Sequence, residues 1–322
     1  MDFGQIALPL GALVVSLAVL WKSSQFVISN STVLARFFGI SELAIGFMLV
    51  SVATSLPEFS ISVLSAVRGA DFTALSVGNV LGANISDITL VLGASALAGK
   101  LAFGKKDYLR LVQVIAVASW IPLILLLDVL GHFGLGQFAG IILLLAFVGY
   151  AYTVLSEKIS FEDGARPTAR ETVFSALWFS AAVAAVIASA NFAVDNAIAL
   201  ASLGGFSKAF IGATIVSLGT TLPELSVSVA AARLGRPGIA IGNVLGSCIV
   251  NLTLVLGTAA AINPLAANLY AFANLVFFFI LANALLWVLL HRGRGLGRNE
   301  GLALLGVYAV FILSALVVEA RF

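Results

Sequence analysis

The chain has 322 residues, of which 61% are hydrophobic and only 10% are charged, with a formal net charge of +2. Because soluble domains carry roughly 45–50% apolar and about 25% charged residues, this composition excludes a soluble globule. A helix in a bilayer needs about 20 mainly apolar residues and no polar coat, so we expect a polytopic membrane protein. The scattered basic residues argue against nucleic-acid binding, and the single cysteine, Cys248, argues against a zinc site.

Apolar stretches separated by charged or Gly/Pro-rich segments predict an all-α protein with ten transmembrane helices. Several stretches exceed the roughly 20 residues that cross a bilayer, so we expect some helices to be tilted or interrupted. In chain order the stretches lie near residues 5–35, 40–67, 72–98, 108–128, 136–156, 171–202, 206–232, 238–262, 268–291 and 299–319.

The basic residues are divided unequally between alternate loops. One side has only Arg68, Lys208 and Arg321. Because cytoplasmic loops carry the excess of Lys and Arg, the richer side is predicted to be cytoplasmic and both termini to lie outside the plasma (inner) membrane. The richer side contains Arg36, Lys100, Lys105, Lys106, Arg110, Lys158, Arg166, Arg170, Arg233, Arg236, Arg292, Arg294 and Arg298.

The two halves of the chain are similar in sequence. Residues 26–58 align with residues 192–224, and GNVLGANISDITLVLG from Gly78 aligns with GNVLGSCIVNLTLVLG from Gly242. Shared Pro-Glu and Gly-Asn pairs are not expected by chance in Ala/Leu/Val-rich helices. The sequence therefore predicts an internal duplication.

The duplication divides the chain into a first five-helix repeat at 1–157, a cytoplasmic linker at 158–170 and a second five-helix repeat at 171–322. An odd number of helices per repeat gives the two repeats opposite orientations. Inverted-topology repeats of this kind are typical of secondary transporters, which bind substrate near the membrane midplane where the repeats meet.

Three carboxylates lie deep within apolar stretches, away from the stretch ends, where each costs about 2.5–3.5 kcal/mol or more. They are Glu58, Asp87 and Glu224. The repeat aligns Glu58 with Glu224 and Asp87 with Asn251. We expect the pseudo-twofold axis to bring these four side chains together, as three carboxylates and one amide that require bound cations.

The segments around the two glutamates, TSLPE at 54–58 and TTLPE at 220–224, supply further oxygen atoms. Proline lacks an N–H and clashes with the carbonyl four residues earlier, so it interrupts the helix and frees carbonyl oxygens. Ca²⁺ accepts 6–8 mixed oxygen ligands in flexible geometry, whereas Mg²⁺ requires a tighter octahedron and retains water. The donor set favours Ca²⁺, and soft metals are disfavoured because thiolate and imidazole ligands are lacking.

These motifs resemble those of the cation/calcium exchanger superfamily, and specifically of its prokaryotic sodium/calcium exchanger branch. The resemblance covers nearly the whole chain and is carried by the pairs SVATSLPEFSISV with GNVLGANISDITLVLG and SLGTTLPELSVSV with GNVLGSCIVNLTLVLG. It implies an antiporter that exchanges Na⁺ for Ca²⁺ by alternating access, normally extrudes Ca²⁺, and is neither an enzyme nor dependent on a cofactor.

The resemblance also implies which residues bind the transported ions. Glu58 and Glu224 would be the central Ca²⁺ ligands, and Asp87 and Asn251 the second polar pair. The remaining implied contributors of side-chain or backbone oxygens to Na⁺ and Ca²⁺ are Ser51, Thr54, Ser55, Ser217, Thr220, Thr221 and Ser247.

The chain departs from the family pattern in three places. The family's familiar order has the amide in the first repeat and the acid in the second, which is the reverse of Asp87 and Asn251. Ala83 stands where a serine is usual, so one sodium site is expected to be weaker. Cys248 replaces an asparagine that is kept at the equivalent Asn84, which is interpreted as a packing variation.

Alternatives to sodium coupling stay open. Three clustered carboxylates can also exchange Ca²⁺ for protons, and a potassium-dependent or other divalent-cation exchanger would use similar ligands. The hydroxyl-rich TSLPE and TTLPE segments favour sodium. The expected partners are therefore Ca²⁺, Na⁺ and the lipid bilayer, and the sequence leaves the oligomeric state open, a monomer included.

Overall fold

A computed structural model describes residues 3–69, 73–102, 136–156, 166–203, 217–265, 269–292 and 295–319. Within these ranges the chain is almost entirely helical. Six of the described helices are long and apolar enough to cross a membrane, or seven if one bent pair counts as a single span. The predicted stretch near 108–128 lies outside the described residues, so the total of ten helices stays a prediction.

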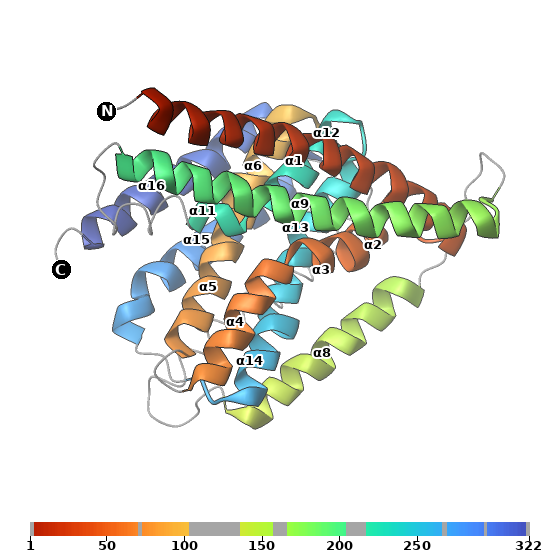
Figure 1. The fold of residues 1–322 in the computed structure, drawn as a ribbon. Coiled ribbons are helices and arrows are strands. Elements are labelled where there is room, and N and C mark those ends of the chain that lie inside the picture. The colour runs from red at the N-terminus through yellow and green to blue at the C-terminus, as the bar shows by residue number, and fades with distance from the viewer. Residues whose placement is uncertain are drawn as a thin grey trace.

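Two long helices, α1 (Phe3–Phe38) and α9 (Ala169–Leu203), lie antiparallel and side by side across the rest of the bundle (Figure 1). They contain 36 and 35 residues. At 1.5 Å per residue each is about 50 Å long, which exceeds the roughly 30 Å hydrocarbon core and requires an oblique path. Phe26 of α1 stacks on Trp178 of α9, with 6.1 Å between ring centroids.

The first half contains a helix that bends by 50° at Ser55 and a second helix interrupted by a π-helical segment. Pro57 stands in the first turn after the bend. The elements are α2 (Glu42–Ile45), η1 (Gly46–Val50), α3 (Ser51–Thr54), α4 (Leu56–Arg68), α5 (Thr73–Ser86), η3 (Asp87–Val91) and α6 (Leu92–Ala98).

The second half has interruptions at the equivalent positions. Its helix breaks at Thr221, which aligns with Ser55, and its π-helical segment contains Asn251, which aligns with Asp87. The elements are α11 (Ser217–Thr220), α12 (Leu222–Arg233), α13 (Pro237–Ile249), η5 (Val250–Val255) and α14 (Leu256–Ile262).

The remaining elements surround these broken helices. They are α8 (Gln137–Ser156), α15 (Leu269–Arg292), α16 (Arg298–Glu319) and a short antiparallel pair, β1 (Leu101–Ala102) with β2 (Gly295–Leu296). The start of α1 and the end of α16 lie on the same side of the view in Figure 1.

The span formed by α13, η5 and α14 occupies the centre of the bundle, with 94% of its most apolar window buried. Glycines on both sides of the contact let it touch α2 and η1 backbone to backbone. A Cβ added at Gly46 would lie 2.8 Å from the Ile239 carbonyl oxygen, and one added at Gly242 would collide with the Leu43 carbonyl oxygen. Larger residues at these positions would separate the helices.

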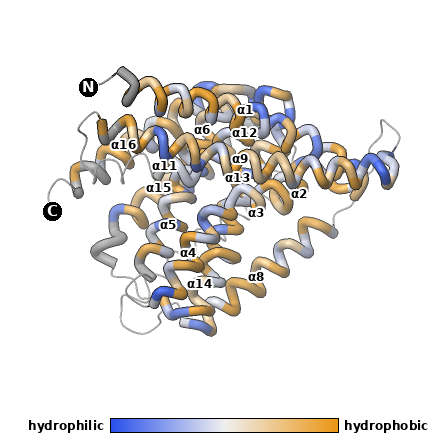
Figure 2. The backbone as a smooth tube through the Cα atoms, in the orientation of Figure 1, coloured by the Kyte–Doolittle hydropathy of each residue, from blue (hydrophilic) through white to orange (hydrophobic). Residues whose placement is uncertain are grey.

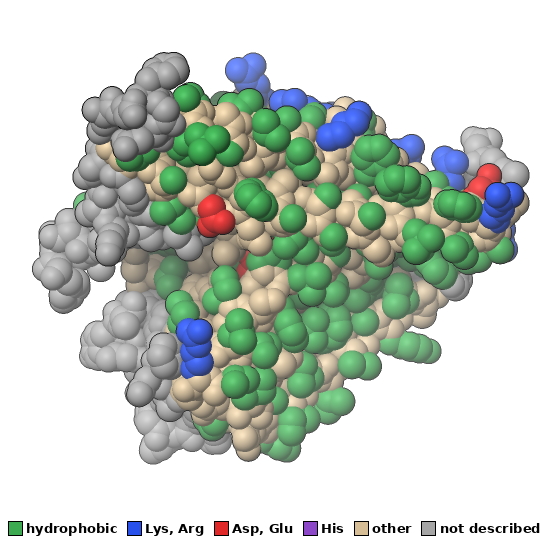
Figure 3. All heavy atoms as spheres, viewed as in Figure 1, with side chains coloured by type: hydrophobic (Ala, Val, Ile, Leu, Met, Phe, Trp, Pro, Cys, Tyr) green, Lys and Arg blue, Asp and Glu red, His purple; other side chains and the backbone are tan. Residues whose placement is uncertain are grey.

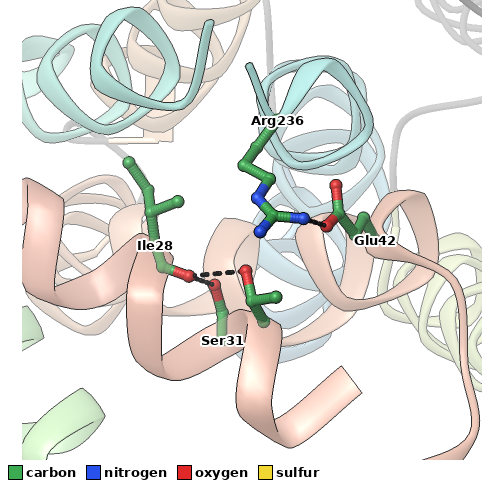
Figure 4. Close-up of polar contacts among 5 residues, drawn as sticks. Ile28, Ser31, Glu42 and Arg236 are labelled. Atoms are coloured by element: carbon green, nitrogen blue, oxygen red, sulfur yellow. Dashed lines mark hydrogen bonds and ion pairs between the residues drawn. The ribbon is translucent and has the colours of Figure 1, made fainter. Parts of the chain in front are cut away.

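An ion pair joins the two halves at one end of this contact. The Arg236 Nη1 lies 2.6 Å from the Glu42 Oε1, next to α1, where the Ser31 hydroxyl donates to the Ile28 carbonyl (Figure 4). Glu42 begins α2, which is capped by the Ser41 hydroxyl accepting from the Ala44 N–H at 3.0 Å. The pair therefore links the start of α2 to the segment that precedes α13.

The outer surface matches a lipid environment. The helices are apolar along most of their length (Figure 2), and hydrophobic side chains cover much of the face seen in Figure 3, where Lys and Arg gather along the upper edge and the right-hand end. Leu8, Phe138 and Tyr152 are each at least 74% exposed. Exposed apolar surface on this scale indicates that the protein is embedded in a membrane.

Candidate ion-binding site

The two helix breaks place a glutamate in the same position. Proline is the second residue of both α4 and α12, and Glu58 and Glu224 follow it in the first turn. Because proline has no N–H, it cannot bond the carbonyl four residues earlier, which belongs to Ala53 or Gly219. Each glutamate therefore lies at a helix N-terminus, where the helix dipole favours negative charge. It also lies beside carbonyl oxygens that the helical backbone hydrogen bonds leave available.

The carboxylates at these positions are buried. Glu58, Asp87 and Glu224 are each 1% exposed. No hydrogen bond of normal geometry from the described residues reaches either oxygen of Glu58, either oxygen of Asp87, or Oε2 of Glu224. Burying an unpaired charge costs several kcal/mol, so these oxygens require bound cations or protons.

Hydroxyls from the first half contact groups of the second half at the break. The Ser55 Oγ donates to Glu224 Oε1 at 3.3 Å, and the Thr54 Oγ1 donates to the Asn243 Oδ1 at 3.1 Å. Thr220, at the end of α11, lies near the Glu58 carboxylate. Each break thus approaches the glutamate of the other half.

Two asparagines that were absent from the predicted set hold the glutamate backbones. The Asn79 Nδ2 donates to the Glu58 carbonyl at 3.1 Å and to the Ser62 Oγ at 3.0 Å. At the equivalent position, the Asn243 Nδ2 donates to the Glu224 carbonyl at 3.4 Å and to the Ser228 Oγ at 2.9 Å. Both belong to the repeated GNVLG motif, which was the available sequence signal.

The second polar pair lies in the π-helical segments, which frequently mark functional sites. Asp87 begins η3 and Asn251 is the second residue of η5. The Asn251 Nδ2 donates to the Asn84 Oδ1 at 3.1 Å, and the Asn84 Nδ2 donates to the Cys248 carbonyl at 3.3 Å. Within the described part of the chain, the Asn251 Oδ1 has no hydrogen-bond partner.

Of the other predicted residues, Ser51, Ser217 and Thr221 lie within four residues of a break in the chain or at it, and Ser247 lies in α13. Ser51 is buried, its hydroxyl donates to the Phe47 carbonyl, and its own carbonyl accepts from the Ser55 N–H at 2.9 Å. The Thr221 hydroxyl donates to the Leu218 carbonyl at 3.0 Å, and Ser217 begins α11. Ser247 in α13 is buried, and its hydroxyl lacks a hydrogen-bond partner among the described residues.

The three carboxylates lie within electrostatic range of one another. They do not form a compact metal-binding group, since no three His, Cys, Asp or Glu side chains in the described ranges lie close enough to share one ion. An ion held by one or two of these carboxylates would need its remaining oxygens from hydroxyls, amides and backbone carbonyls. Ca²⁺ accepts such a mixed set.

Intramembrane carboxylates mark ion pathways, so glutamates buried at two equivalent helix breaks, with three of their four oxygens lacking a hydrogen-bond partner among the described residues, indicate the class of cation transporters. The sequence profile of the sodium/calcium exchanger protein family matches residues 8–156 and again residues 174–317. The chain therefore belongs to the sodium/calcium exchanger protein family, and the resemblance noted in the sequence is confirmed.

Individual relatives agree with this assignment. A putative antiporter, CaxA, from Alkalimonas amylolytica is 31% identical over 89% of this chain and 92% of its own length. The sodium/calcium exchanger MaX1 from Methanosarcina acetivorans is 26% identical over 94% of this chain and 96% of its own. The sodium-calcium exchanger NCX_Mj, soaked with 10 mM Na⁺ and no Ca²⁺, has a similar structure, with a TM-score of 0.81, 28% identity, and coverage of 96% of this chain and 99% of that one.

Proposed function

We propose that the protein is a secondary antiporter that exchanges Na⁺ for Ca²⁺ and normally extrudes Ca²⁺. The observation that carries the proposal is the pair Glu58 and Glu224, buried at equivalent helix breaks, where both Glu58 carboxylate oxygens and Oε2 of Glu224 have no hydrogen-bond partner among the described residues. Family membership and the named relatives favour Ca²⁺ as the transported divalent cation.

The architecture that we propose is two inverted repeats of five transmembrane helices, at 1–157 and 171–322, joined by the linker at 158–170. Three observations support it. The family profile matches the two halves separately, α1 and α9 run antiparallel (Figure 1), and the helix breaks occur at aligned residues.

The proposed ligands are those nominated by the sequence. Na⁺ and Ca²⁺ would compete for overlapping oxygens, so that occupancy by one excludes the other and couples their movements. The set is Glu58, Glu224, Asp87, Asn251, Thr54, Ser55, Thr220, Thr221, Ser51, Ser217 and Ser247.

The transport cycle would move α1 and α9 across the remaining bundle, so that the site opens to one side of the plasma membrane at a time. Both termini would lie outside, as the distribution of Lys and Arg favours. If three Na⁺ exchange for one Ca²⁺, one net charge crosses per cycle, which is worth about 2.3 kcal/mol per 100 mV. An imposed membrane potential would then change the exchange rate.

A Ca²⁺/H⁺ antiporter is the second candidate. The specific observation in its favour is that all four carboxylate oxygens of Glu58 and Asp87 lack a hydrogen-bond partner within the described ranges. Such oxygens can bind protons in place of metal cations. The hydroxyls of Thr54 and Ser55 at the break are hard oxygen ligands that suit Na⁺, and they favour the sodium-coupled reading.

The test is transport by the purified protein in liposomes. Vesicles loaded with Na⁺ are diluted into Na⁺-free buffer that contains ⁴⁵Ca²⁺, with a parallel arm in which a proton gradient replaces Na⁺. Wild type is compared with Glu58→Gln, Glu224→Gln and the matched control Asp195→Asn, which removes an exposed carboxylate of α9.

Sodium/calcium exchange predicts uptake that requires internal Na⁺, disappears in both glutamate variants and persists in Asp195→Asn. Uptake that follows the proton gradient and ignores Na⁺ would replace the first candidate with the second. Uptake that survives both glutamate substitutions would show that the ions bind elsewhere.

A further inference from the structure

We propose that Asn84 is a positioning residue that fixes the direction of the Asn251 carboxamide, so that the Asn251 carbonyl oxygen is presented to the transported cation. The proposal rests on the proposed function, because it concerns the same ion site. It also explains why Cys248, the repeat partner of Asn84, is compatible with that site.

The direction of both amides is set by a backbone carbonyl. A carbonyl oxygen can only accept hydrogen bonds, so Asn84 must turn its NH₂ group towards the Cys248 carbonyl, which lies 3.3 Å from Nδ2. The Asn84 Oδ1 then faces Asn251. Because that oxygen also only accepts, Asn251 must present its own NH₂ group, at 3.1 Å.

The other end of Asn251 is therefore an oxygen. The Asn251 Oδ1 points away from Asn84, is buried, and has no hydrogen-bond partner in the described part of the chain. If Asn251 were free to rotate by half a turn, the same position would hold an NH₂ group, which repels a cation. The relay from Cys248 through Asn84 thus selects the cation-binding orientation and polarises the last carbonyl.

The repeat gives this relay a counterpart. Position 248 aligns with Asn84, and Asp87 aligns with Asn251. A carboxylate carries oxygen at both ends, so rotation of Asp87 by half a turn changes nothing and no orienting amide is needed beside it. Position 248 can therefore be a cysteine. If residue 87 were an asparagine, position 248 would need an asparagine to orient the amide of residue 87.

The first experiment measures whether the relay acts on ion affinity. Asn84→Leu keeps the branched arrangement of four side-chain heavy atoms but cannot orient Asn251, and Asn251→Leu removes the ligand. Loss of one oriented bond of about 1–1.5 kcal/mol corresponds to about a tenfold loss of affinity. We expect Asn84→Leu to raise the dissociation constant for ⁴⁵Ca²⁺ and the half-maximal concentration for transport about tenfold, with the maximal rate within about twofold.

The double variant separates positioning from general packing. Asn84→Leu combined with Asn251→Leu should bind no more weakly than Asn251→Leu alone, since Asn84 has nothing left to orient. Asn263→Leu is the matched control and should stay within about twofold of wild type, because its Nδ2 donates to the Ala66 carbonyl and takes no part in the relay. An Asn84→Leu affinity equal to wild type, or additive losses in the double variant, would overturn the proposal.

The second experiment exchanges the pairs between the halves. The double variant Asp87→Asn/Asn251→Asp keeps the charge but leaves the new amide unoriented and places Asn84 Oδ1 against a carboxylate. Adding Asn84→Cys and Cys248→Asn gives a fourfold variant in which the orienting asparagine and the amide that it orients are both moved to the other half. We expect the double variant to bind at least about tenfold more weakly than wild type, and the fourfold variant to return to within about threefold.

Full affinity in the double variant, or a folded fourfold variant that binds no better than the double, would contradict the pairing. If the fourfold variant does not give a monodisperse protein, the Asn84→Leu result decides. Equilibrium binding of ⁴⁵Ca²⁺ tests the role of Asn84 independently of transport. A wild type that binds Ca²⁺ but does not exchange it for Na⁺ would therefore end the proposed function, while the Asn84→Leu comparison would still support or overturn the relay.

Discussion

Asn243 offers a sharp test of whether the helix breaks are held by carboxamides. Three hydrogen bonds meet at this fully buried side chain, to the Glu224 carbonyl at 3.4 Å, to Ser228 at 2.9 Å and from Thr54 at 3.1 Å. Asn243→Leu keeps the branched arrangement of side-chain heavy atoms and removes all three hydrogen bonds. We expect the ion-binding geometry to loosen because both the Glu224 break and the Thr54 break lose a contact.

The magnitude follows from the two bonds that touch the breaks. At about 1 kcal/mol each, their loss weakens ion binding by about 2 kcal/mol, or about 30-fold. The third bond, to Ser228, contributes to folding and adds about 1 kcal/mol of destabilisation. Asn243→Leu should therefore bind ⁴⁵Ca²⁺ between about tenfold and 100-fold more weakly and should unfold at a lower temperature.

The assay combines equilibrium ⁴⁵Ca²⁺ binding with thermal unfolding in detergent. Asn79→Leu is the repeat-matched variant, with bonds to Glu58 and Ser62, and should also lose affinity. Asn263→Leu is the control, because its Nδ2 donates to the Ala66 carbonyl at 3.3 Å in a contact without a carboxylate. An Asn243→Leu protein with wild-type affinity would refute the reasoning, as would an equal loss of affinity in Asn263→Leu.

Two further predictions concern the contact between the halves. The Glu42–Arg236 pair has side chains that are 24% and 40% exposed, so Glu42→Gln should cost at most about 1 kcal/mol, a loss that shrinks in 1 M salt. The exchanged pair Glu42→Arg/Arg236→Glu should recover stability in a thermal melt, and no recovery would argue against a direct pairing. Gly246→Ala should destabilise the folded protein by about 1–3 kcal/mol, because the added Cβ would lie 2.7 Å from the Phe47 carbonyl oxygen. At its repeat partner, Gly82, an added Cβ would meet no described atom within 4 Å, so Gly82→Ala should leave the stability unchanged. Detergent unfolding measures both, and equal effects at the two glycines would be inconsistent with the packing described.

The sequence by itself was sufficient to identify the membrane class and the residues at the helix breaks, and it predicted the duplication. These features are local or compositional. Apolar side chains in excess of a soluble protein's share require lipid, and Pro57 and Pro223 interrupt a helix wherever it folds because they lack an N–H. The carboxylates of Glu58, Asp87 and Glu224 stand out for the same reason, since each is costly in an apolar span.

The tertiary structure alone decided how the polar groups are paired. Thr54 and Asn243 are 189 residues apart, and Asn84 and Asn251 are 167 apart, so no local pattern specifies their bonds. In the sequence, Asn79 and Asn243 are ordinary members of the repeated GNVLG segments, and Asn84 follows the first segment by two residues. Their roles depend on which carbonyl each amide meets when two distant helices cross, and an amide takes its direction from that partner.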